Sequence, residues 1–276
     1  MTRSVRVAAI QLNCGIDAVE NLDKARPLLR AAAAEGAELL ITPENSLRLD
    51  GNRPRALAAV TSPDNETQIA AWSTLARELR VWLLMGSGGV PASPAKVFNR
   101  SFLFAPDGST AARYDKINLF DVQLGGGEAY RESANIQAGD KAVLATGPHA
   151  VRIGMTICYD LRFPELYGAL ARAGAELITI PAAFTVTTGR AHWEILVRAR
   201  AIETATFVVA PAQGGVHDGG RETWGHSLIV NPWGEVIARL EHRDPGYVIA
   251  DLNLDEVTQA RAKIPAWNGG ATFTGP

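Results

Sequence analysis

The chain has 276 residues, 47% of them hydrophobic, and a formal net charge of −2. A chain of this length and apolar content can bury a large core, so a single layered α/β domain, residues 1–276, can account for all of it. Acidic and basic residues are interspersed, which argues against a nucleic-acid-binding surface, and no stretch is long and apolar enough for a membrane span. The expected partner is therefore a small molecule.

The chain contains two cysteines, Cys14 and Cys158, which are too few for a disulfide framework. No basic and apolar leader precedes the first strand-like segment, so the sequence favours a cytoplasmic location. The five histidines are dispersed and lack metal-ligand spacing, and we expect no metal site.

Hydrophobic periodicity predicts a unit that occurs twice. Apolar residues alternate as in a buried strand over 5–12, recur at helical spacing over 18–35, and form a second strand over 36–44. The same order of strand, helix and strand returns at 151–158, 164–173 and 174–182. Further on, the predicted helices 65–80 and 191–204 each lead into a strand, and a hairpin with a Pro-x-Gly turn follows at 100–116 and at 226–242. A strand from Tyr247 and a helix over 255–263 complete the chain.

Each half therefore reads strand, helix, strand, helix, strand, strand. Strands that alternate with helices are mostly parallel, and each half would form one sheet whose helices cover one face. If the uncovered faces meet, the result is a four-layer α-β-β-α sandwich of two stacked sheets with pseudo-two-fold symmetry. Ligands of such sheets bind beyond the carboxyl ends of the strands. The longest irregular segment, 123–139, is expected to be a loop that covers the site.

Three predicted strands end in residues that can carry chemistry, namely Glu44, Lys116 and Cys158. Singly, each has an ordinary interpretation: a surface carboxylate, a solvated lysine, and a buried cysteine that packs as a small apolar residue. Because a helix start follows Cys158, we expect its thiolate form to be favoured. Together, a cysteine supplies a nucleophile, a carboxylate transfers the proton and an ammonium stabilises an oxyanion.

Three segments resemble the signatures of the nitrilase, or carbon-nitrogen hydrolase, superfamily: PEN (43–45), RYDKINLFD (113–121) and CYDLRFPE (158–165). Residues 183–203 and 224–236 resemble the branch that contains deaminated glutathione amidases and omega-amidases. The resemblance covers nearly the whole chain. It implies an α-β-β-α sandwich, assembly as a homodimer or larger homo-oligomer, and chemistry that needs no metal or organic cofactor.

The resemblance also implies a role for each active-site residue. Glu44 would be the general base and then the general acid, and Cys158 would form a thioester. Lys116 and the backbone amide of Tyr159 would bind the oxyanion, and Glu132 matches a further glutamate that relatives have at the active site. The reaction implied is hydrolysis of a linear amide to a carboxylic acid and ammonia.

Residues after Cys158 suggest how the substrate is held. The guanidinium of Arg162 could bind a substrate carboxylate in bidentate fashion, or it could instead pair with Asp160 or Glu165. Thr188 could donate a hydrogen bond from its hydroxyl group, and Phe184 could form an apolar wall. These residues suggest an amide that also bears a carboxylate, and the resemblance implies one of the deaminated glutathione or 2-oxo acid amide type.

Some features depart from the family pattern or leave alternatives open. Asn118 stands where relatives often have histidine, Arg190 replaces a common proline, and the tail after Trp267 is Gly-rich. The loop 213–222 would contact the distal end of a longer substrate. The alternative functions are an N-carbamoyl amino acid amidohydrolase, a nitrile hydrolase, a hydrolase with His192 as base, and a catalytically silent binding or scaffold protein of the same fold.

Overall fold

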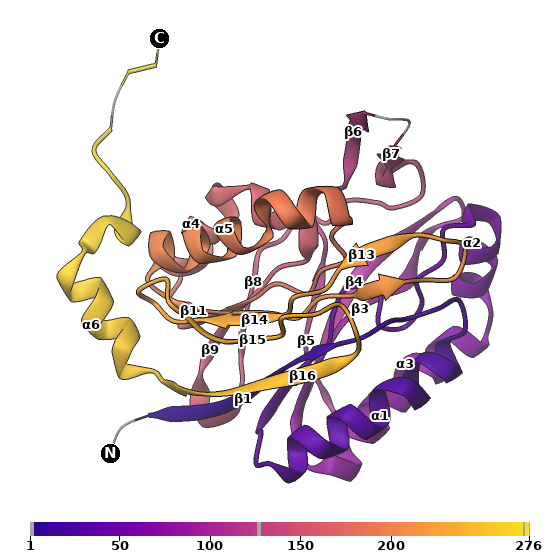
Figure 1. Ribbon diagram of the computed structural model, residues 1–276, viewed down its shortest axis with the longest axis horizontal. Coiled ribbons are helices and arrows are strands. Elements are labelled where there is room, and N and C mark those ends of the chain that lie inside the picture. Colours follow the sequence, from indigo (N-terminus) through magenta and orange to yellow (C-terminus); the bar gives the residue numbers. More distant parts are fainter. Residues whose placement is uncertain (1–2, 126–127, 273, 276) are drawn as a thin grey trace.

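Two six-stranded sheets form the centre of the protein (Figure 1). The computed structural model describes residues 3–125, 128–272 and 274–275. The first sheet contains β1 (Ser4–Gln11), β2 (Leu39–Ile41), β3 (Trp82–Ser93), β4 (Lys96–Phe104), β5 (Thr110–Asp115) and β16 (Gly246–Asn253). The second contains β8 (Val143–Thr146), β9 (Arg152–Met155), β10 (Leu177–Thr179), β11 (Phe207–Ala210), β14 (Leu228–Val230) and β15 (Val236–Arg239).

The two sheets repeat one strand order, β16-β1-β2-β3-β4-β5 in the first and β8-β9-β10-β11-β14-β15 in the second. In each, three successive strands are parallel and the next two are antiparallel. An additional antiparallel strand completes each sheet at the same position, β16 beside β1 and β8 beside β9. The predicted duplication is confirmed, although the strand β8 was not predicted.

Helices cover the outer face of each sheet, which confirms the predicted four-layer sandwich (Figure 1). The helices are α1 (Ala18–Ala34), α2 (Arg53–Thr61), α3 (Asp64–Leu79), α4 (Pro164–Arg172), α5 (Val186–Thr204) and α6 (Asp255–Lys263). α1 and α3 pack on the first sheet, and α4 and α5 pack on the second. Among the described residues, no helix is long and apolar enough to cross a membrane.

Alternation along β1 shows how its sequence builds two layers of core. Val7 and Ala9 belong to the buried cluster that also contains Met155 of the second sheet. Ala8 and Ile10 point the other way, into the cluster that contains the buried residues of α1 and α3. Successive residues of a strand face opposite sides of a sheet, so an apolar strand with both faces buried is what this position between two layers requires.

Several elements differ from the prediction. The helix α5 begins at Val186, five residues before the predicted start, because the Thr185 hydroxyl caps it by accepting from the amide of Thr188. The helix α2 was not predicted. The segment 123–139, expected to be irregular, contains in its described part the end of β6 (Asp121–Gly125), the strand β7 (Glu128–Arg131) and the 3-10 helix η1 (Glu132–Ala134), whereas residues 126–127 lie outside the described residues.

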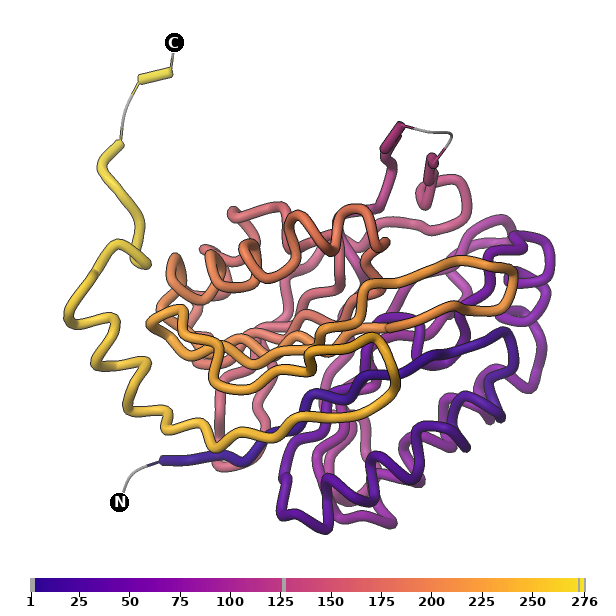
Figure 2. Tube along the Cα trace, in the orientation of Figure 1, coloured from indigo at the N-terminus to yellow at the C-terminus, as the bar shows by residue number. Residues whose placement is uncertain are grey.

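The first and last strands of the chain lie side by side in one sheet. The last strand, β16, runs antiparallel to β1 along its whole length, as the tube in Figure 2 shows where yellow-orange lies beside indigo. The strands β12 (Gly214–Val216) and β13 (Glu222–Trp224) form a separate two-stranded hairpin in the second half of the chain. The loop 213–222 therefore includes β12 and leads into β13.

Candidate active site

Glu44 lies three residues after β2, in a segment that the neighbouring strand holds closely. A Cβ atom on Gly86 of β3 would lie 1.9 Å from the carbonyl oxygen of Thr42 and 2.3 Å from that of Pro43, so only glycine fits there. Asn45 has a left-handed backbone, with φ of 61°, and its amide donates to Oγ of Ser87 over 2.7 Å. The backbone around Glu44 is therefore fixed by β3.

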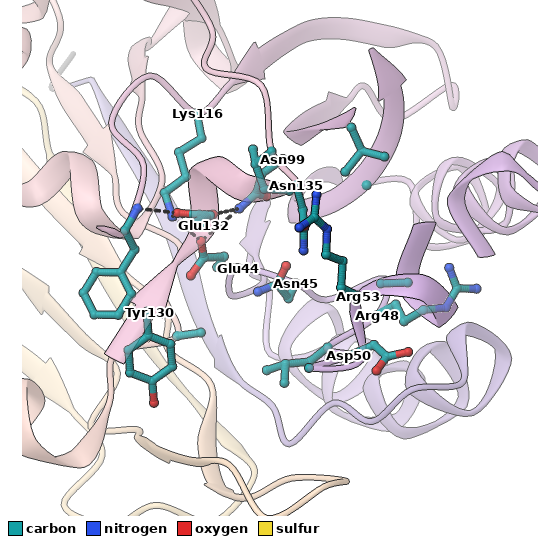
Figure 3. A pocket seen from close by; sticks show the side chains of 18 of the residues that line it. Glu44, Asn45, Arg48, Asp50, Arg53, Asn99, Lys116, Tyr130, Glu132 and Asn135 are labelled. Atoms are coloured by element: carbon teal, nitrogen blue, oxygen red, sulfur yellow. Dashed lines mark hydrogen bonds and ion pairs between the residues drawn. The ribbon is translucent and has the colours of Figure 1, made fainter. Parts of the chain in front are cut away.

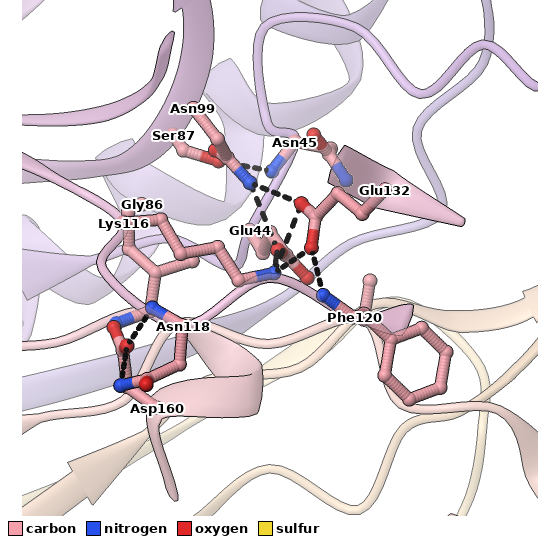
Figure 4. Close-up of polar contacts among 12 residues, drawn as sticks. Glu44, Asn45, Gly86, Ser87, Asn99, Lys116, Asn118, Phe120, Glu132 and Asp160 are labelled. Atoms are coloured by element: carbon pink, nitrogen blue, oxygen red, sulfur yellow. Dashed lines mark hydrogen bonds and ion pairs between the residues drawn. The ribbon is translucent and has the colours of Figure 1, made fainter. Parts of the chain in front are cut away.

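Lys116 follows β5 directly and lies between two carboxylates (Figure 4). Its Nζ is 2.8 Å from Oε1 of Glu44 and 2.9 Å from Oε2 of Glu132. The amide of Phe120 donates to the same oxygen of Glu132. Lys116 and Glu44 are almost fully buried. The strand β2 is parallel to β3, which is antiparallel to β4, and β4 is antiparallel to β5. The strands β2 and β5 therefore run in the same direction, and their carboxyl ends lie at the same edge of the sheet.

Burial and the opposite charges have opposing effects on these groups. Burial lowers the pKa of Lys116, but Glu132 and Glu44 outweigh it and hold that pKa well above its ordinary value. Burial raises the pKa of Glu44, but the charge of Lys116 and the hydrogen bond from it outweigh burial and lower that pKa. Glu44 is thus ionised at neutral pH and available to accept a proton.

Asn99 is a member of this network that the sequence did not predict. Its Nδ2 donates to Oε1 of Glu44 over 3.0 Å and lies 3.4 Å from Oε1 of Glu132, and its backbone oxygen accepts from the amide of Lys116. Its Oδ1 is buried and has no partner within the described residues. The only sequence signal is an asparagine between the apolar residues Val97, Phe98 and Phe102 to Phe104 of the strand KVFNRSFLF, and its burial is evident from the structure alone.

Cys158 begins the 3-10 helix η3 (Cys158–Arg162) with a left-handed backbone, φ of 48°. Its amide donates to the carbonyl oxygen of Pro181 over 2.8 Å. The amide of Tyr159 is in the first turn of η3, where backbone amides have no acceptor within the helix. The corner expected between strand and helix is therefore present, with a short helix as its first element.

The side chain of Asp160 stabilises the backbone at this corner through hydrogen bonds. Its oxygens accept from the amide of Ile157 over 2.9 Å and from the hydroxyl of Tyr114 over 2.7 Å. They also accept from the backbone and the side chain of Asn118, each over 2.9 Å. Asn118, the departure from the family pattern, thus supports the backbone before Cys158 through Asp160 (Figure 4).

The expectation of a favoured thiolate is wrong for this site. Burial is the largest influence on Cys158, and with the nearby charge of Glu44 it raises the pKa of the thiol well above its ordinary value, against the opposing effect of Lys116. The helix start would lower the pKa of the thiol, but burial has the larger and opposite effect. The thiol rests protonated, and its hydrogen bond with Glu44 lowers the pKa of that carboxyl.

A cavity of about 280 Å³ joins these groups (Figure 3). Of the predicted residues, those that line it are Glu44, Lys116, Glu132, Cys158, Phe184 and Thr188. Arg221, at the end of the loop 213–222, also lines the cavity and donates to the carbonyl oxygen of Ala183. Its charge lowers the pKa of Glu44, after the larger effects of burial and Lys116.

Arg162 is not among the residues that line this cavity. Its guanidinium lies over the rings of Phe184 and Tyr159, 5.5 and 5.8 Å from their centroids. Its Nη2 is 3.3 Å from Nδ1 of His192. His192 itself lines a separate cavity together with Trp224. Arg162 thus contacts the wall residue Phe184. Among the described residues it forms no ion pair with Asp160 or Glu165.

Within the ranges that the structure describes, no group of three histidine, cysteine, aspartate or glutamate side chains is arranged to hold a metal ion. Both cysteines are free and buried. The charged and nucleophilic side chains that line the cavity are one thiol, one ammonium, three carboxylates and four guanidinium groups: Cys158, Lys116, Glu44, Asp50, Glu132, Arg48, Arg53, Arg131 and Arg221.

Comparison with known proteins agrees with this geometry. The sequence profile described as "Carbon-nitrogen hydrolase" matches residues 6–262. The chain is 40% identical to a deaminated glutathione amidase of Synechocystis, over 94% of this chain and 95% of that protein. It is 35% identical to human omega-amidase NIT2, over 96% and 94%. The crystal structure of Saccharomyces cerevisiae Nit3, from branch 10 of the nitrilase superfamily, superposes with a TM-score of 0.83 at 26% identity, covering 95% of each chain.

Proposed function

We propose, because this chain belongs to the carbon-nitrogen hydrolase family, that it hydrolyses a linear, carboxylate-bearing amide through a thioester on Cys158. The observation that carries this proposal is the ion network of Lys116 with Glu44 and Glu132, which lines the same cavity as Cys158. The network provides an ionised carboxylate that can accept the thiol proton and a charged ammonium that can stabilise the oxyanion. The whole chain would act as one domain.

In the first half of the proposed reaction, Glu44 takes the thiol proton as Sγ of Cys158 attacks the amide carbon. The negative oxygen of the tetrahedral intermediate is stabilised by Nζ of Lys116 and the backbone amide of Tyr159. The carbon-nitrogen bond then breaks, and Glu44 gives its proton to the departing nitrogen. A primary amide releases ammonia and leaves an acyl thioester.

In the second half, Glu44 removes a proton from a water molecule, which attacks the thioester carbon. The carbon-sulfur bond breaks, the thiolate takes the proton back from Glu44, and the carboxylic acid leaves. Glu132 would act by keeping Lys116 charged and oriented, since it accepts from Nζ at 2.9 Å. Glu44 is ionised again at the end of each half, and the thiol proton that leaves with ammonia in the first half is replaced by a proton from water in the second, so no cofactor is consumed.

The cavity wall supports a substrate that carries a negative charge. Besides the ion network, the lining includes the arginines Arg48, Arg53, Arg131 and Arg221. A deaminated-glutathione-type or 2-oxo acid amide, as the names of the two relatives suggest, bears such a charge. Phe184 and Thr188 would form one wall of the acyl site, and Arg162 would orient Phe184 by stacking over its ring.

A screen of four substrate classes tests this assignment: deaminated glutathione, 2-oxoglutaramate, an N-carbamoyl amino acid and a nitrile. Release of ammonia or of the amine is measured for each. We expect the carboxylate-bearing amides to have the highest kcat/KM. Preference for the nitrile or for the N-carbamoyl amino acid would replace the proposal by one of these two alternatives.

The role of Cys158 has a separate test. Cys158→Ala should be folded and inactive, and mass spectrometry of the wild type during turnover should detect an acyl adduct on Cys158. The absence of an adduct and of turnover with every class would favour a binding or scaffold protein. His192 lines another cavity, so His192→Ala should keep most of the rate. Loss of activity in that variant would favour a Cys/His hydrolase.

We further propose that the protein acts in the cytoplasm and as a homodimer or larger homo-oligomer. In support, α5 exposes Ile195 and Ile202, and Trp233 in the β14–β15 turn is also exposed. Light scattering after size-exclusion chromatography measures the oligomeric state, and a monomer at micromolar concentration would contradict the proposal. Cell fractionation tests the location.

A further inference from the structure

The general base and the nucleophile of the site belong to different sheets. Glu44 follows β2 of the first sheet, and Cys158 follows β9 of the second. Asn99 and Lys116, which contact the carboxylate of Glu44 (Figure 4), belong to the first half of the chain. The core between the sheets is apolar, and apolar contacts have no preferred direction. These contacts therefore do not set the distance between Glu44 and Cys158.

Gln213, in the second half, links Glu44 to that half. Its side chain is fully buried. Its Nε2 donates to the backbone carbonyl oxygen of Glu44 over 3.0 Å, and its Oε1 accepts from the amide of Cys14 over 3.0 Å. Both ends of the side-chain amide are thus bound to the first half, and one end is bound to the residue that carries the general base.

The backbone of Gln213 is bound to the segment that holds Cys158. Its amide donates to the carbonyl oxygen of Ala182 over 2.8 Å. The residue before, Pro181, accepts from the amide of Cys158 over 2.8 Å. The residue after, Ala183, forms a backbone hydrogen bond with the thiol, which lowers the pKa of Cys158. Three successive residues therefore connect Gln213 with the backbone and the sulfur of the nucleophile.

We propose that Gln213 is a positioning residue that sets the distance between Glu44 and Cys158. This inference rests on the proposed function, in which Glu44 takes the thiol proton. The path from base to nucleophile consists of the hydrogen bonds Glu44–Gln213, Gln213–Ala182 and Pro181–Cys158. Gln213 is not among the residues that line the cavity, so it acts through Glu44 and not on the substrate.

Gln11 offers a matched control. It is also a fully buried glutamine that links the two halves. Its Oε1 accepts from the amide and the hydroxyl of Ser227, and its Nε2 donates to the carbonyl oxygens of His242 and Asp244. Among the described residues, no hydrogen bond joins its side chain to Glu44. Loss of stability from broken contacts between the halves is therefore common to both glutamines, whereas displacement of Glu44 is expected for Gln213 alone.

Gln213→Met and Gln11→Met remove the amide group and keep the length of the side chain. For each we measure kcat and KM with whichever amide of the substrate screen the wild type hydrolyses fastest, and stability by urea unfolding. In Gln213→Met we expect kcat to fall about ten- to hundredfold and KM to change by less than about threefold, because a displaced base affects the transition state. Gln11→Met should lose stability but keep most of the wild-type kcat.

Gln213→Glu provides a test by rescue. Its carboxylate still accepts from Cys14 but cannot donate to Glu44 until it is protonated, and burial beside the charge of Glu44 raises its pKa. Relative to the wild type at the same pH, kcat should therefore be low at pH 8 and recover at pH 6. This variant decides the matter if Gln213→Met does not fold. Equal losses of kcat in both methionine variants, or a relative kcat of Gln213→Glu that does not depend on pH, would overturn the positioning role.

Failure of the proposed function has a different signature, since the wild type then hydrolyses none of the amides. The position of Glu44 is in that case measured through Cys158 alone. The charge of Glu44 raises the pKa of the thiol, so displacement of Glu44 should lower that pKa. Alkylation of Cys158 by iodoacetamide at pH 8, followed by mass spectrometry of its peptide, should be at least about threefold faster in Gln213→Met than in the wild type or Gln11→Met. Equal rates in the three proteins would overturn the inference.

Discussion

Nδ2 of Asn99 donates to Oε1 of Glu44 over 3.0 Å, and this oxygen is the one that also accepts from Lys116. One carboxylate oxygen thus has two donors. Hydrogen bonds to the ionised form of a carboxyl group favour that form, so Asn99 supports the protonation state in which Glu44 can act as a base.

For Asn99→Ala we expect kcat/KM to fall about ten- to hundredfold, since a hydrogen bond to a charged group is lost. The acid limb of the pH profile should also move to higher pH, because the ionised form of Glu44 loses a donor. Measurement of kcat/KM between pH 4 and 8 checks this. Asn99→Asp, which adds a negative charge, should move the limb further in the same direction. A lower melting temperature with an unmoved limb would mean that Asn99 has only a structural role.

Lys116→Met should abolish turnover and make stability depend on pH. In the wild type the pKa of Lys116 is raised, so its stabilising effect is present below the ordinary lysine pKa and is lost only as pH rises through the raised value. Without Lys116, Glu44 loses the ammonium that lowers its pKa and faces the carboxylate of Glu132, so the pKa of Glu44 rises. Protonation of Glu44 in the folded state should then stabilise the variant as pH falls.

Urea unfolding at pH 5, 7 and 8 measures this effect. We expect the variant to be destabilised by about 3–5 kcal/mol at pH 8, the range for removing one partner of a buried ion pair, and by less at pH 5. The wild type, measured alongside, is the reference. Equal destabilisation at the three pH values would contradict the proposed coupling.

The free enzyme should react slowly with alkylating agents at neutral pH. The pKa of the Cys158 thiol is raised well above its ordinary value, mainly by burial, so the thiol form predominates at pH 7. The rate of alkylation by iodoacetamide should rise with pH to at least pH 9. Burial raises the pKa of Cys14 to about 12, and Cys158→Ala measures its background. A plateau below pH 8 would show a thiolate that burial does not suppress.

Gly86→Ala should lower both stability and activity. The added Cβ would meet the carbonyl oxygens of Thr42 and Pro43, and relief requires the backbone before Glu44 to move. We expect a loss of about 1–3 kcal/mol or more from overpacking, and a roughly hundredfold loss of kcat if Glu44 shifts by about 1 Å. Gly51→Ala, where a Cβ meets nothing within 4 Å, is the control for stability in urea unfolding. Equal stability of the two variants would refute the steric argument.

The fold could be predicted because its signals are local and repeated. The segments GAELLITPE and GAELITIPA contain β2 and β10, which occupy equivalent places in their sheets. Glu44 and Lys116 could be placed together because each follows a strand, and parallel strands have their carboxyl ends at the same edge of a sheet. The helix α2 was not predicted because its segment 53–61 is only weakly amphipathic, although Asn52 caps it by accepting from the amide of Arg55 and Pro54 lies in its first turn.

The rest of the site depends on distances that no sequence pattern contains. Asn99 contributes through a side chain between two carboxylates, and Gln213 through a hydrogen bond to the backbone of Glu44. Arg162 was expected to face the substrate from its place four residues after Cys158, but the turn of η3 directs it over the ring of Phe184. The predicted thiolate form of Cys158 was wrong because burial raises the pKa of the thiol by more than the helix start lowers it.

The left-handed backbone of Cys158 lowers the stability of the fold at the residue that carries the proposed nucleophile. A non-glycine residue with φ of 48° costs about 1–2 kcal/mol relative to a right-handed one, and glycine would remove most of this strain. Glycine has no sulfur. The proposed reaction therefore depends on a residue that the backbone conformation at this corner disfavours.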